Sequence, residues 1–473
     1  DGDCPTKPFG GADDFAISPD GKTVLFSAKW MGNDAPWKTD FDLWQTPIDG
    51  SAKPQNLTEA NKAWDAAAVF SPDGKTVAYR AMRRPGFEAD RFAVMLRDMK
   101  TGTIRPLAAA WDRSAADMAF SPDGKTLYVT AEEEGQIKLF AIAVATGRVR
   151  ALTDQGSVGA FAVRPDGIFY ARADLKSPTE IYRIGLAGGR PVRLTHADDK
   201  ALSGVKWADW ERFRFKGWND EEVQGIVMKP ADYRPGKKYP VAFLIHGGPQ
   251  GSFGNSWSYR WNPQIYAHAG YAVVMIDFHG STGYGQAFTD AISRHWGDRP
   301  LEDLQKGWAF ALEKYPFLDG DRAAALGASY GGFMINWIAS QWNGPWKCLV
   351  AHDGVFDARG MGYSTEELWF DEWEHGGTFY DVPKDYEKFN PAAHVTEWRK
   401  PMLVVHGGND FRIPLAQGLG AFTALQRQGI SSRFLYFPDE NHWVLKPQNS
   451  VLWHQTVLAW LDRWTKVTAG NSK

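Results

Sequence analysis

The chain has 473 residues with 53 basic and 56 acidic side chains, so it carries no positive excess that would attract a nucleic acid. Apolar residues make up 44% and charged residues 23%, which is the composition of a core-forming protein and excludes a mainly disordered chain. The apolar run at 271–276 is far shorter than the roughly 20 residues that cross a bilayer, so we predict no transmembrane helix. The length predicts two or three folded units.

The first residue and the cysteines bear on processing and location. The sequence begins at Asp1, without a Met or a signal-peptide pattern, so we expect its numbering to start after processing or inside a longer chain. Cys4 and Cys348 are the two cysteines, which excludes a disulfide framework and fits either a reducing or an oxidising compartment. The sequence assigns neither cysteine a role.

A repeat occupies residues 1–206. The string Ser-Pro-Asp-Gly-Lys-Thr begins at Ser18, Ser71 and Ser121, and the variant Arg-Pro-Asp-Gly begins at Arg164. Pro fixes φ and Gly accepts a positive φ, so each Pro-Asp-Gly predicts a tight turn between two short strands. The repeat length of about 40 to 50 residues is that of a propeller blade. We predict an N-terminal β-propeller with four blades in this chain. Because the array starts in mid-pattern, we expect a larger propeller with its first blades outside the chain.

Residues 207–473 have a different pattern, in which apolar strand-like runs alternate with longer helical segments. This alternation is typical of an α/β domain with a parallel sheet. The readable strands lie at 241–246, 272–277, 323–327, 348–351, 402–406 and 434–437. Ligands and catalytic groups gather at the carboxyl edge of such a sheet, so we expect the functional site there.

One motif in this half predicts a catalytic nucleophile. Gly327-Ala-Ser329-Tyr-Gly331 follows the apolar strand at 323–327 and precedes the helical segment at 333–341. A Gly-x-Ser-x-Gly between strand and helix forms a nucleophile elbow, in which a serine occupies a strained turn and the helix N-terminus favours negative charge. We therefore predict that Ser329 is the nucleophile of an α/β-hydrolase.

A serine nucleophile needs a base and an orienting acid, which follow it in this fold in the order Ser, Asp, His. Asp410 and His442 come after the last two predicted strands. Several histidines lie near strand ends, so position alone does not select the base. Of the histidines, His442 and His454 follow Asp410, and His454 lies within a helical segment. We predict His442 as the general base and Asp410 as its orienting acid, with Asp439 as the alternative acid.

The oxyanion of the reaction needs two N–H donors. One is expected from the backbone of Tyr330, directly after the nucleophile, and the other from the loop after an early strand. That loop reads His246-Gly-Gly248-Pro, and we select Gly248 as the second donor. A plain tight turn is the alternative for this loop.

Together these motifs resemble the prolyl oligopeptidase family of serine peptidases, in its acylaminoacyl-peptidase branch, over nearly the whole chain. The resemblance rests on the blades, the His246-Gly-Gly-Pro loop, the Ser329 motif and Gly408-Asn-Asp-Phe-Arg-Ile-Pro414. Within the branch, the stretches at 84–91 and 363–373 are most similar to dipeptidyl-peptidases. The family usually has a seven-bladed propeller, which implies that about three blades are missing here or are kept as a separate N-terminal fragment.

The resemblance implies oligopeptide substrates and assigns several binding residues. Arg412 is expected to reach the carbonyl of the second substrate residue, and a surface salt bridge is the alternative. A dipeptidyl-peptidase must hold a free α-ammonium with carboxylates at a fixed distance from Ser329. Glu88 and Asp90 are the candidates, and their neighbouring arginines are the alternative partners.

Aromatic residues near the nucleophile predict where the first substrate side chain lies. Tyr330, Phe356, Trp369 and Trp373 could form an apolar pocket, which would favour a hydrophobic or small side chain. Packing within the core is the alternative for each ring.

We therefore predict a serine exopeptidase that releases dipeptides from the free N-terminus of oligopeptides through an acyl-enzyme. The reaction needs no cofactor, and no His-x-x-x-His or Cys-x-x-Cys spacing indicates a metal site. An acylaminoacyl-peptidase or broader oligopeptidase is the alternative, and an inert propeller scaffold or binding protein is the alternative of another class. The resemblance also suggests a homodimer and a periplasmic or secreted location.

Overall fold

The computed structural model describes residues 11–30 and 32–466. The chain divides into two compact units, and the boundary along the sequence lies between Gly204 and Val205. Two short segments of the C-terminal half, Gly254–Trp257 and Thr282–Gln286, belong to the first unit. Of the two cysteines, Cys4 lies outside the described residues and Cys348 is a buried free thiol.

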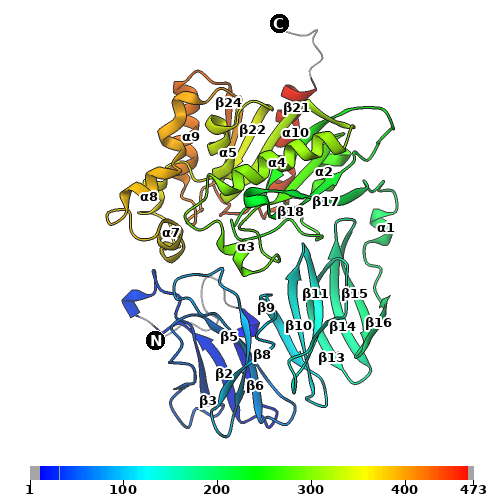
Figure 1. Cartoon of the computed structure of the whole chain (residues 1–473), viewed down its shortest axis with the longest axis vertical. Coiled ribbons are helices and arrows are strands. Elements are labelled where there is room, and N and C mark those ends of the chain that lie inside the picture. Colours follow the sequence, from blue (N-terminus) through cyan, green and yellow to red (C-terminus); the bar gives the residue numbers. More distant parts are fainter. Residues whose placement is uncertain (1–10, 31, 467–473) are drawn as a thin grey trace. The chain divides into compact units, whose positions relative to one another are not determined.

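The first unit consists of antiparallel meanders of four strands, and a single parallel pairing between Ile137 and Ser157 joins the last two into one eight-stranded sheet (Figure 1). The first two are β1 (Phe15–Ile17), β2 (Thr23–Ala28), β3 (Asp42–Pro47) and β4 (Gln55–Asn56), then β5 (Asp65–Phe70), β6 (Thr76–Ala81), β7 (Ala93–Asp98) and β8 (Ile104–Leu107). The next two are β9 (Ala115–Phe120), β10 (Thr126–Glu133), β11 (Gln136–Ala143) and β12 (Val149–Ala151), then β13 (Ser157–Arg164), β14 (Gly167–Asp174), β15 (Ser177–Gly185) and β16 (Gly188–Arg193). The described residues thus form four propeller blades, which confirms the predicted fold of this half.

The repeated sequence makes the same turn in three blades. In the second blade, the Ser71 hydroxyl donates to Asp73 (2.7 Å) and accepts from the backbone N–H of Thr76 (3.0 Å). Gly74 has a φ of 69°, in the left-handed region. The copies that begin at Ser18 and Ser121 form the same bonds. The motif therefore recurs because it satisfies the backbone groups of the hairpin between the first two strands of a blade.

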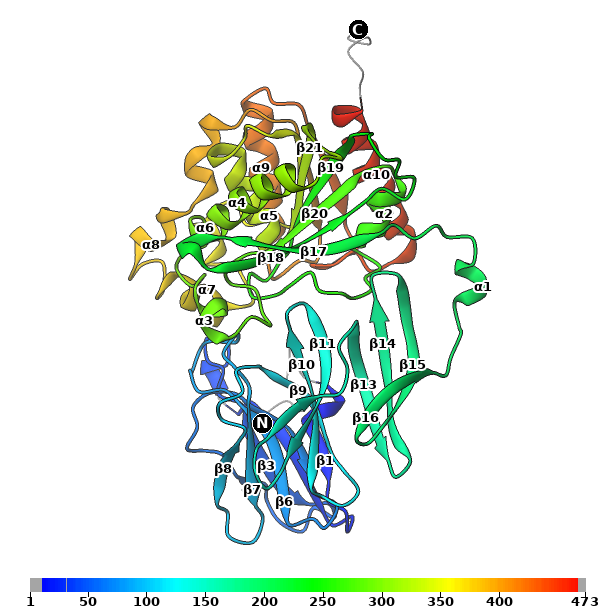
Figure 2. The ribbon, with the colours of Figure 1, turned by 45° about the vertical axis from the view of Figure 1, so that its right-hand side comes forward.

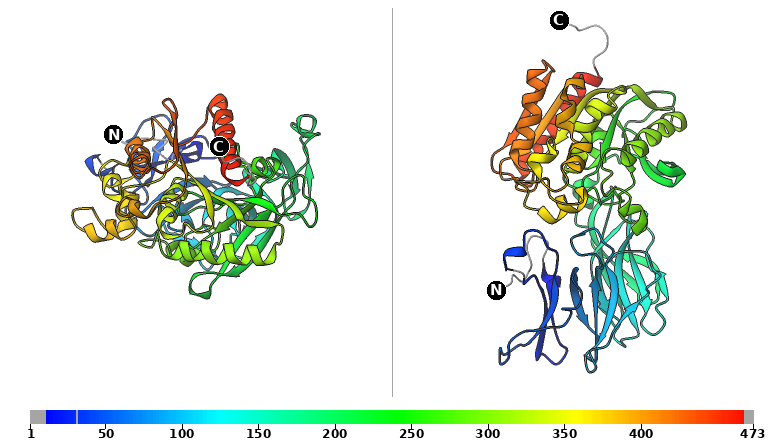
Figure 3. Two further views of the ribbon diagram at one scale, coloured as in Figure 1. Left: turned by 90° about the horizontal axis from the view of Figure 1, so that it is seen from above. Right: turned by 60° about the vertical axis from the view of Figure 1, so that its left-hand side comes forward.

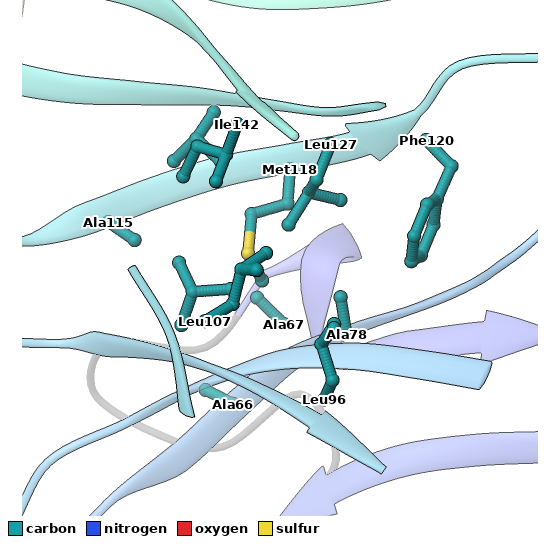
Figure 4. Packing of buried hydrophobic residues seen from close by; sticks show 12 residues of the cluster. Ala66, Ala67, Ala78, Leu96, Leu107, Ala115, Met118, Phe120, Leu127 and Ile142 are labelled. Carbon is teal, nitrogen blue, oxygen red and sulfur yellow. The ribbon is translucent and has the colours of Figure 1, made fainter. Parts of the chain in front are cut away.

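Small and branched side chains pack between the second and third blades. Met118 and its neighbours on β9 to β11 face residues of β5 to β8 (Figure 4). The cluster comprises Ala66, Ala67, Ala78, Val94, Leu96, Leu107, Ala115, Met118, Phe120, Leu127, Val129 and Ile142. The many alanines on β5 allow the two sheets to approach closely, so this cluster joins the two blades through their faces.

The second unit contains one eight-stranded sheet in the order β17-β18-β20-β19-β21-β22-β23-β24. The strands are β17 (Trp210–Lys216), β18 (Glu222–Met228), β19 (Tyr239–Ile245), β20 (Ala272–Asp277), β21 (Leu318–Ala328), β22 (Trp346–His352), β23 (Met402–Gly407) and β24 (Ser432–Phe437). From β20 to β24 the neighbours are parallel, and β17 and β18 form an antiparallel edge (Figure 2). The six predicted strands are β19 to β24. The central runs of β19 to β23 are buried on both faces, whereas β24 is a partly exposed edge strand.

Helices cover both faces of this sheet, with α4 and α10 on opposite sides (Figure 3). The helices of the second unit are α2 (Pro263–His268), α3 (Gln286–Asp290), α4 (Arg299–Lys314), α5 (Tyr330–Gln341), α6 (Ala358–Met361), α7 (Leu368–His375), α8 (Pro383–Lys388), α9 (Leu415–Arg427) and α10 (Pro447–Thr465), and α1 (Asp199–Leu202) precedes them. Within the described ranges, none of the helices combines the length and the apolar character needed to cross a membrane. This sheet order and its helices are those of the predicted α/β-hydrolase.

Candidate active site

Ser329 occupies a sharp turn between β21 and α5. Its φ of 59° and ψ of −123° lie outside the regions that non-glycine residues prefer, so the turn is strained. A Cβ at Gly331 would lie 2.2 Å from the carbonyl oxygen of Ile245, so this position of the motif requires glycine. The sequence and the geometry agree with a nucleophile elbow, in which the serine side chain projects from the carboxyl end of a central strand.

The two predicted oxyanion donors belong to backbone segments that adjoin Ser329. Tyr330 is the first residue of α5, where a backbone N–H has no acceptor within the helix. A Cβ added to Gly247 would lie 3.1 Å from the Cβ of Ser329, so the glycine loop approaches the nucleophile closely. Gly248 has a φ of 123°, and a Cβ there would lie 2.5 Å from the nitrogen of Gln250. The loop conformation therefore depends on glycine at 248.

Asp410 and His442 form a buried hydrogen-bonded pair. Nδ1 of His442 lies 2.7 Å from Oδ2 of Asp410. The other carboxylate oxygen accepts from the backbone N–H groups of Arg412 (3.0 Å) and Ile413 (2.9 Å). This arrangement fixes the imidazole ring and leaves Nε2 as the nitrogen available to a serine.

Electrostatics favour a proton on His442. Burial lowers the pKa of His442, but the negative charges of Asp353 and Asp410 oppose burial and raise the pKa above its ordinary 6.5. The positive charge of Arg412 acts in the opposite direction. A base with this environment is well suited to accept a proton during the reaction and to return it later.

Asp353 is a buried residue of this site that the sequence did not single out. It follows β22 directly, and its Oδ1 accepts from the backbone N–H of Ser329 at 2.7 Å. Its Oδ2 lies 3.7 Å from Nδ1 of His442. One carboxylate oxygen of Asp353, one of Asp410 and one imidazole nitrogen of His442 lie within 4.8 Å of one another. The position of Asp353 just after a predicted strand was the available signal, since acidic groups at such strand ends converge on the site.

A cavity within the second unit lies beside these elements. It is lined by Arg294, Trp296, Phe333, Val355, Ala358, Met361, Phe370, Asp371, Glu374, His375, Asp385 and Phe389. Phe333 belongs to the helix that follows Ser329, and Val355 comes two residues after Asp353. Glu374 is 1% exposed and accepts from Nε1 of Trp296 at 2.7 Å. The cavity is thus mainly aromatic and aliphatic, with acidic groups in its wall.

The four rings predicted to form an apolar pocket do not line this cavity. Tyr330 is 1% exposed and its hydroxyl donates to the carbonyl of Trp296 at 2.6 Å. Phe356 packs edge to face against Trp398. Trp369 is buried, and Trp373 donates through Nε1 to Ser293 at 3.2 Å. The side chains that line the cavity come instead from neighbouring positions such as 333, 355 and 370.

Arg412 lies between two glutamates. Its guanidinium is 2.7 Å from Oε1 of Glu367 and 3.4 Å from Oε1 of Glu366. Glu367 is buried and Glu366 is exposed. The ring of Trp443 lies 5.9 Å from the same guanidinium. Arg412 is thus held in a defined position, two residues from the acid that orients His442.

The two predicted amine anchors lie in the first unit, in the loop between β6 and β7. Asp90 is buried and accepts from the backbone N–H groups of Arg83 and Arg84, at 2.7 and 2.8 Å. It also accepts from the guanidinium of Arg84 at 2.8 and 2.6 Å. These four bonds favour a role for Asp90 in the structure of its own loop. Glu88 is half-buried, and its role as an anchor stays a prediction.

Comparisons with known proteins bear on both units. The profile of the Prolyl oligopeptidase family matches residues 257–468. The profile described as "Lactonase, 7-bladed beta-propeller" matches residues 42–164. The first match covers Ser329, Asp410 and His442, and the second covers blades of the first unit.

Curated relatives of this chain include dipeptidyl-peptidases from fungi. Probable dipeptidyl-peptidase 5 of Aspergillus clavatus is 40% identical over 99% of this chain and 67% of its own length. Dipeptidyl-peptidase 5 of Aspergillus fumigatus has the same identity and coverage. This chain therefore spans about two thirds of the length of these relatives.

Solved structures with low sequence identity share the fold. The acylaminoacyl peptidase of Pyrococcus horikoshii aligns with a TM-score of 0.84 and 22% identity, over 97% of this chain and 72% of that one. Dipeptidyl peptidase 4 of Porphyromonas gingivalis aligns with a TM-score of 0.71 and 16% identity, over 95% and 74%. The relatives at 40% identity and the profile match over the catalytic half lead to one assignment: the chain belongs to the prolyl oligopeptidase family and is a serine peptidase.

Proposed function

We propose that this serine peptidase releases dipeptides from the free N-terminus of oligopeptides. The main support is the buried, hydrogen-bonded pair of His442 and Asp410 beside the strained turn of Ser329. In addition, the chain is 40% identical to proteins named dipeptidyl-peptidase 5. An inert scaffold would not need an imidazole fixed by a carboxylate next to a strained serine.

The proposed reaction proceeds through an acyl-enzyme. His442 accepts the hydroxyl proton of Ser329 as Oγ attacks the carbonyl carbon of the second peptide bond. The N–H groups of Tyr330 and Gly248 stabilise the oxyanion, and the imidazolium then donates its proton to the leaving amine. A water molecule, activated by the same imidazole, hydrolyses the ester and restores the free serine.

The charges around Arg412 support recognition of a free α-amine. Arg412, Glu366 and Glu367 together carry a net charge of −1 at neutral pH, which the ammonium of a substrate would neutralise. We expect Arg412 to hold the carbonyl of the second residue before the cleaved bond. This residue is the N-terminal one, so its α-carbon carries the ammonium. A carboxylate in contact with Arg412 is then within reach of the ammonium, so we propose the two glutamates as its anchors.

The cavity has a volume of only about 20 Å³, and its apolar wall supports a preference for a small or hydrophobic side chain before the cleaved bond. Trp296, Phe333, Val355 and Phe370 supply apolar walls beside the elements that carry Ser329. Small side chains would also be accepted there. The homodimer, the retained N-terminal fragment and the periplasmic or secreted location remain predictions from the family resemblance.

The test is the identity of the first product. An oligopeptide of about eight residues with a free N-terminus is incubated with the protein and with Ser329→Ala, and the products are identified by mass spectrometry. We expect dipeptides, released one after another, from the unmodified protein and none from the variant. Release of single acylated residues from an N-acetylated peptide, with no dipeptides from the free one, would favour an acylaminoacyl-peptidase instead.

A further inference from the structure

One carboxylate of the site contacts both the nucleophile and the base. We propose that Asp353 is a second positioning carboxylate of this enzyme. One of its oxygens holds the backbone of Ser329, and the other brings its negative charge close to Nδ1 of His442. The two distances are 2.7 Å to the Ser329 nitrogen and 3.7 Å to Nδ1. The proposal rests on the proposed roles of Ser329 and His442.

The main chain holds Asp353 firmly in this position. Its backbone N–H donates to the carbonyl of Val405 on β23 at 2.8 Å, and its side chain is 2% exposed. Its φ of 38° lies in the left-handed region, which Asp tolerates better than most residues. The N–H of Ser329 also lies 3.1 Å from the carbonyl of His352, so the strained turn is fixed by the end of β22 at two acceptors.

The distances from His442 to its two neighbouring acids indicate different roles for them. Asp410 already accepts the Nδ1 hydrogen at 2.7 Å, so Asp353 at 3.7 Å contributes charge and not a second strong hydrogen bond. Arg412 is the positive group that opposes both acids. The imidazolium that forms when His442 takes the serine proton is therefore stabilised by two carboxylates.

The groups that face Asp353 keep it ionised. Oδ2 lies 3.4 Å from Nε2 of His352, and the charges of His406 and Arg260 also act on this region. Burial raises the pKa of Asp353, but the three histidines and the N–H of Ser329 outweigh it and lower the pKa below its ordinary 3.8. Burial lowers the pKa of His352, and the negative charge of Asp353 acts in the opposite direction.

The test compares pH profiles for hydrolysis of p-nitrophenyl acetate, a probe that needs the nucleophile but no peptide specificity. Asp353→Asn keeps an oxygen that can accept from the Ser329 N–H and removes the charge. We expect kcat to fall roughly tenfold on the pH plateau and the acid limb of kcat/KM to move down by about one pH unit. A purely structural role would lower kcat without moving the limb, and that result would overturn the proposal.

A matched control uses another buried aspartate with a histidine partner. Asp303 is 0% exposed and lies 2.7 Å from Nδ1 of His279, outside the proposed catalytic group. Asp303→Asn should leave the acid limb where it is in the unmodified enzyme. An equal shift in both variants would mean that the effect is general, and the proposal would fail.

A second variant keeps the test decisive if Asp353→Asn does not fold. In Asp410→Asn, Asp353 remains the one carboxylate near Nδ1, and we expect a loss of kcat of about a hundredfold or less. Where a triad has a single orienting acid, the same change costs roughly 10⁴-fold. A loss of that size here would contradict the proposal.

The same assay separates this inference from the proposed function. Ser329→Ala that hydrolyses the ester as fast as the unmodified enzyme would refute the nucleophile, and with it both proposals. Normal ester hydrolysis without dipeptide release would refute the dipeptidyl activity alone. Asp353→Asn with an unchanged limb, in an enzyme that does release dipeptides, would refute the role of Asp353 alone.

Discussion

At the scale of single residues, the chemistry depends on which charges face His442. Burial lowers the pKa of His442 and Arg412 lowers it further, but the charges of Asp353 and Asp410 outweigh both and raise it. The base must be neutral to accept the serine proton, and a raised pKa keeps it protonated to a higher pH. As the pH is lowered, activity should therefore be lost at a higher pH than for an ordinary imidazole.

We expect the acid limb of kcat/KM to have its midpoint above pH 6.5 in the unmodified enzyme. The physical cause is the stabilisation of the imidazolium by Asp353 and Asp410. The measurement is ester hydrolysis from pH 5 to 9, because an ester has no amine of its own that titrates in this range. A midpoint below 6.5 would show that burial of His442 prevails over the two charges.

The glutamates beside Arg412 give a second prediction. Glu367→Gln should raise KM for a dipeptidyl anilide with a free amine by about tenfold or more, because a charge-assisted bond to the ammonium is lost. KM for the N-acetylated compound should change little. Glu397→Gln, an exposed glutamate near His394, is the control. Equal effects of Glu367→Gln on both substrates would assign Glu367 to the support of Arg412 only.

The residues of the site differed in how well sequence alone could predict them. Ser329 lies in a local motif, and chain order then selected His442 and Asp410, so these three needed no tertiary information. Asp353 and the glutamates beside Arg412 were not predicted, because their contacts join segments far apart in the chain. The predicted rings do not line the cavity, because the sequence does not show which face of a helix or loop a ring takes.

At the scale of elements, the elbow between β21 and α5 has little room for change. A Cβ at Gly331 meets the carbonyl oxygen of Ile245 at 2.2 Å, so the helix would have to move away from the sheet. Gly331→Ala should therefore reduce kcat by at least a hundredfold and lower Tm. Gly344→Ala, where a Cβ would meet nothing within 4 Å, should change neither kcat nor Tm appreciably. Full activity of Gly331→Ala would contradict this geometry.

A buried acid at the start of β5 predicts how the stability of the first unit depends on pH. Burial raises the pKa of Asp65 from 3.8 to about 7, and its Oδ2 accepts no hydrogen bond from the described residues. Because the folded pKa is raised, the stability that the neutral carboxyl provides is complete below about pH 3.8 and is lost as the pH rises to about 7.

We expect the free energy of unfolding to fall by on the order of 1 to 3 kcal/mol more between pH 5 and pH 8 in the unmodified protein than in Asp65→Asn. The measurement is urea unfolding at both pH values, followed by fluorescence. Identical pH dependence of the two proteins would mean that Asp65 is ionised in the folded state without cost.

Strands and helices were predictable where the hydrophobic pattern was regular or a turn motif was distinct. The Pro-Asp-Gly turns identified all four blades, and in three of them the turn is closed by its own Ser and Asp side chains. The strands β19 to β23 are apolar on both faces and were readable as runs, and the edge strand β24 was readable from the apolar residues at 434–437. The antiparallel strands β17 and β18 were not singled out, since β17 alternates polar and apolar residues and lies at the edge of the sheet.

At the scale of the whole molecule, the chain combines four blades with a complete hydrolase sheet and spans 67% of the length of its curated relatives. The near balance of 53 basic and 56 acidic residues means that selectivity for a charged N-terminus must come from local groups, not from net charge. The central claim is therefore that this enzyme requires a free α-amine two residues before the bond it cleaves.

The most direct measurement compares kcat/KM for a dipeptidyl anilide with a free N-terminus and for its N-acetylated twin, with Ser329→Ala as the blank. A hydrophobic or small residue such as Phe or Ala precedes the anilide. We predict that the free-amine compound is cleaved at least a hundredfold more efficiently, because the acetyl group removes the ammonium and occupies its place. Equal or faster cleavage of the acetylated compound would contradict the account and assign the enzyme to the acylaminoacyl-peptidases.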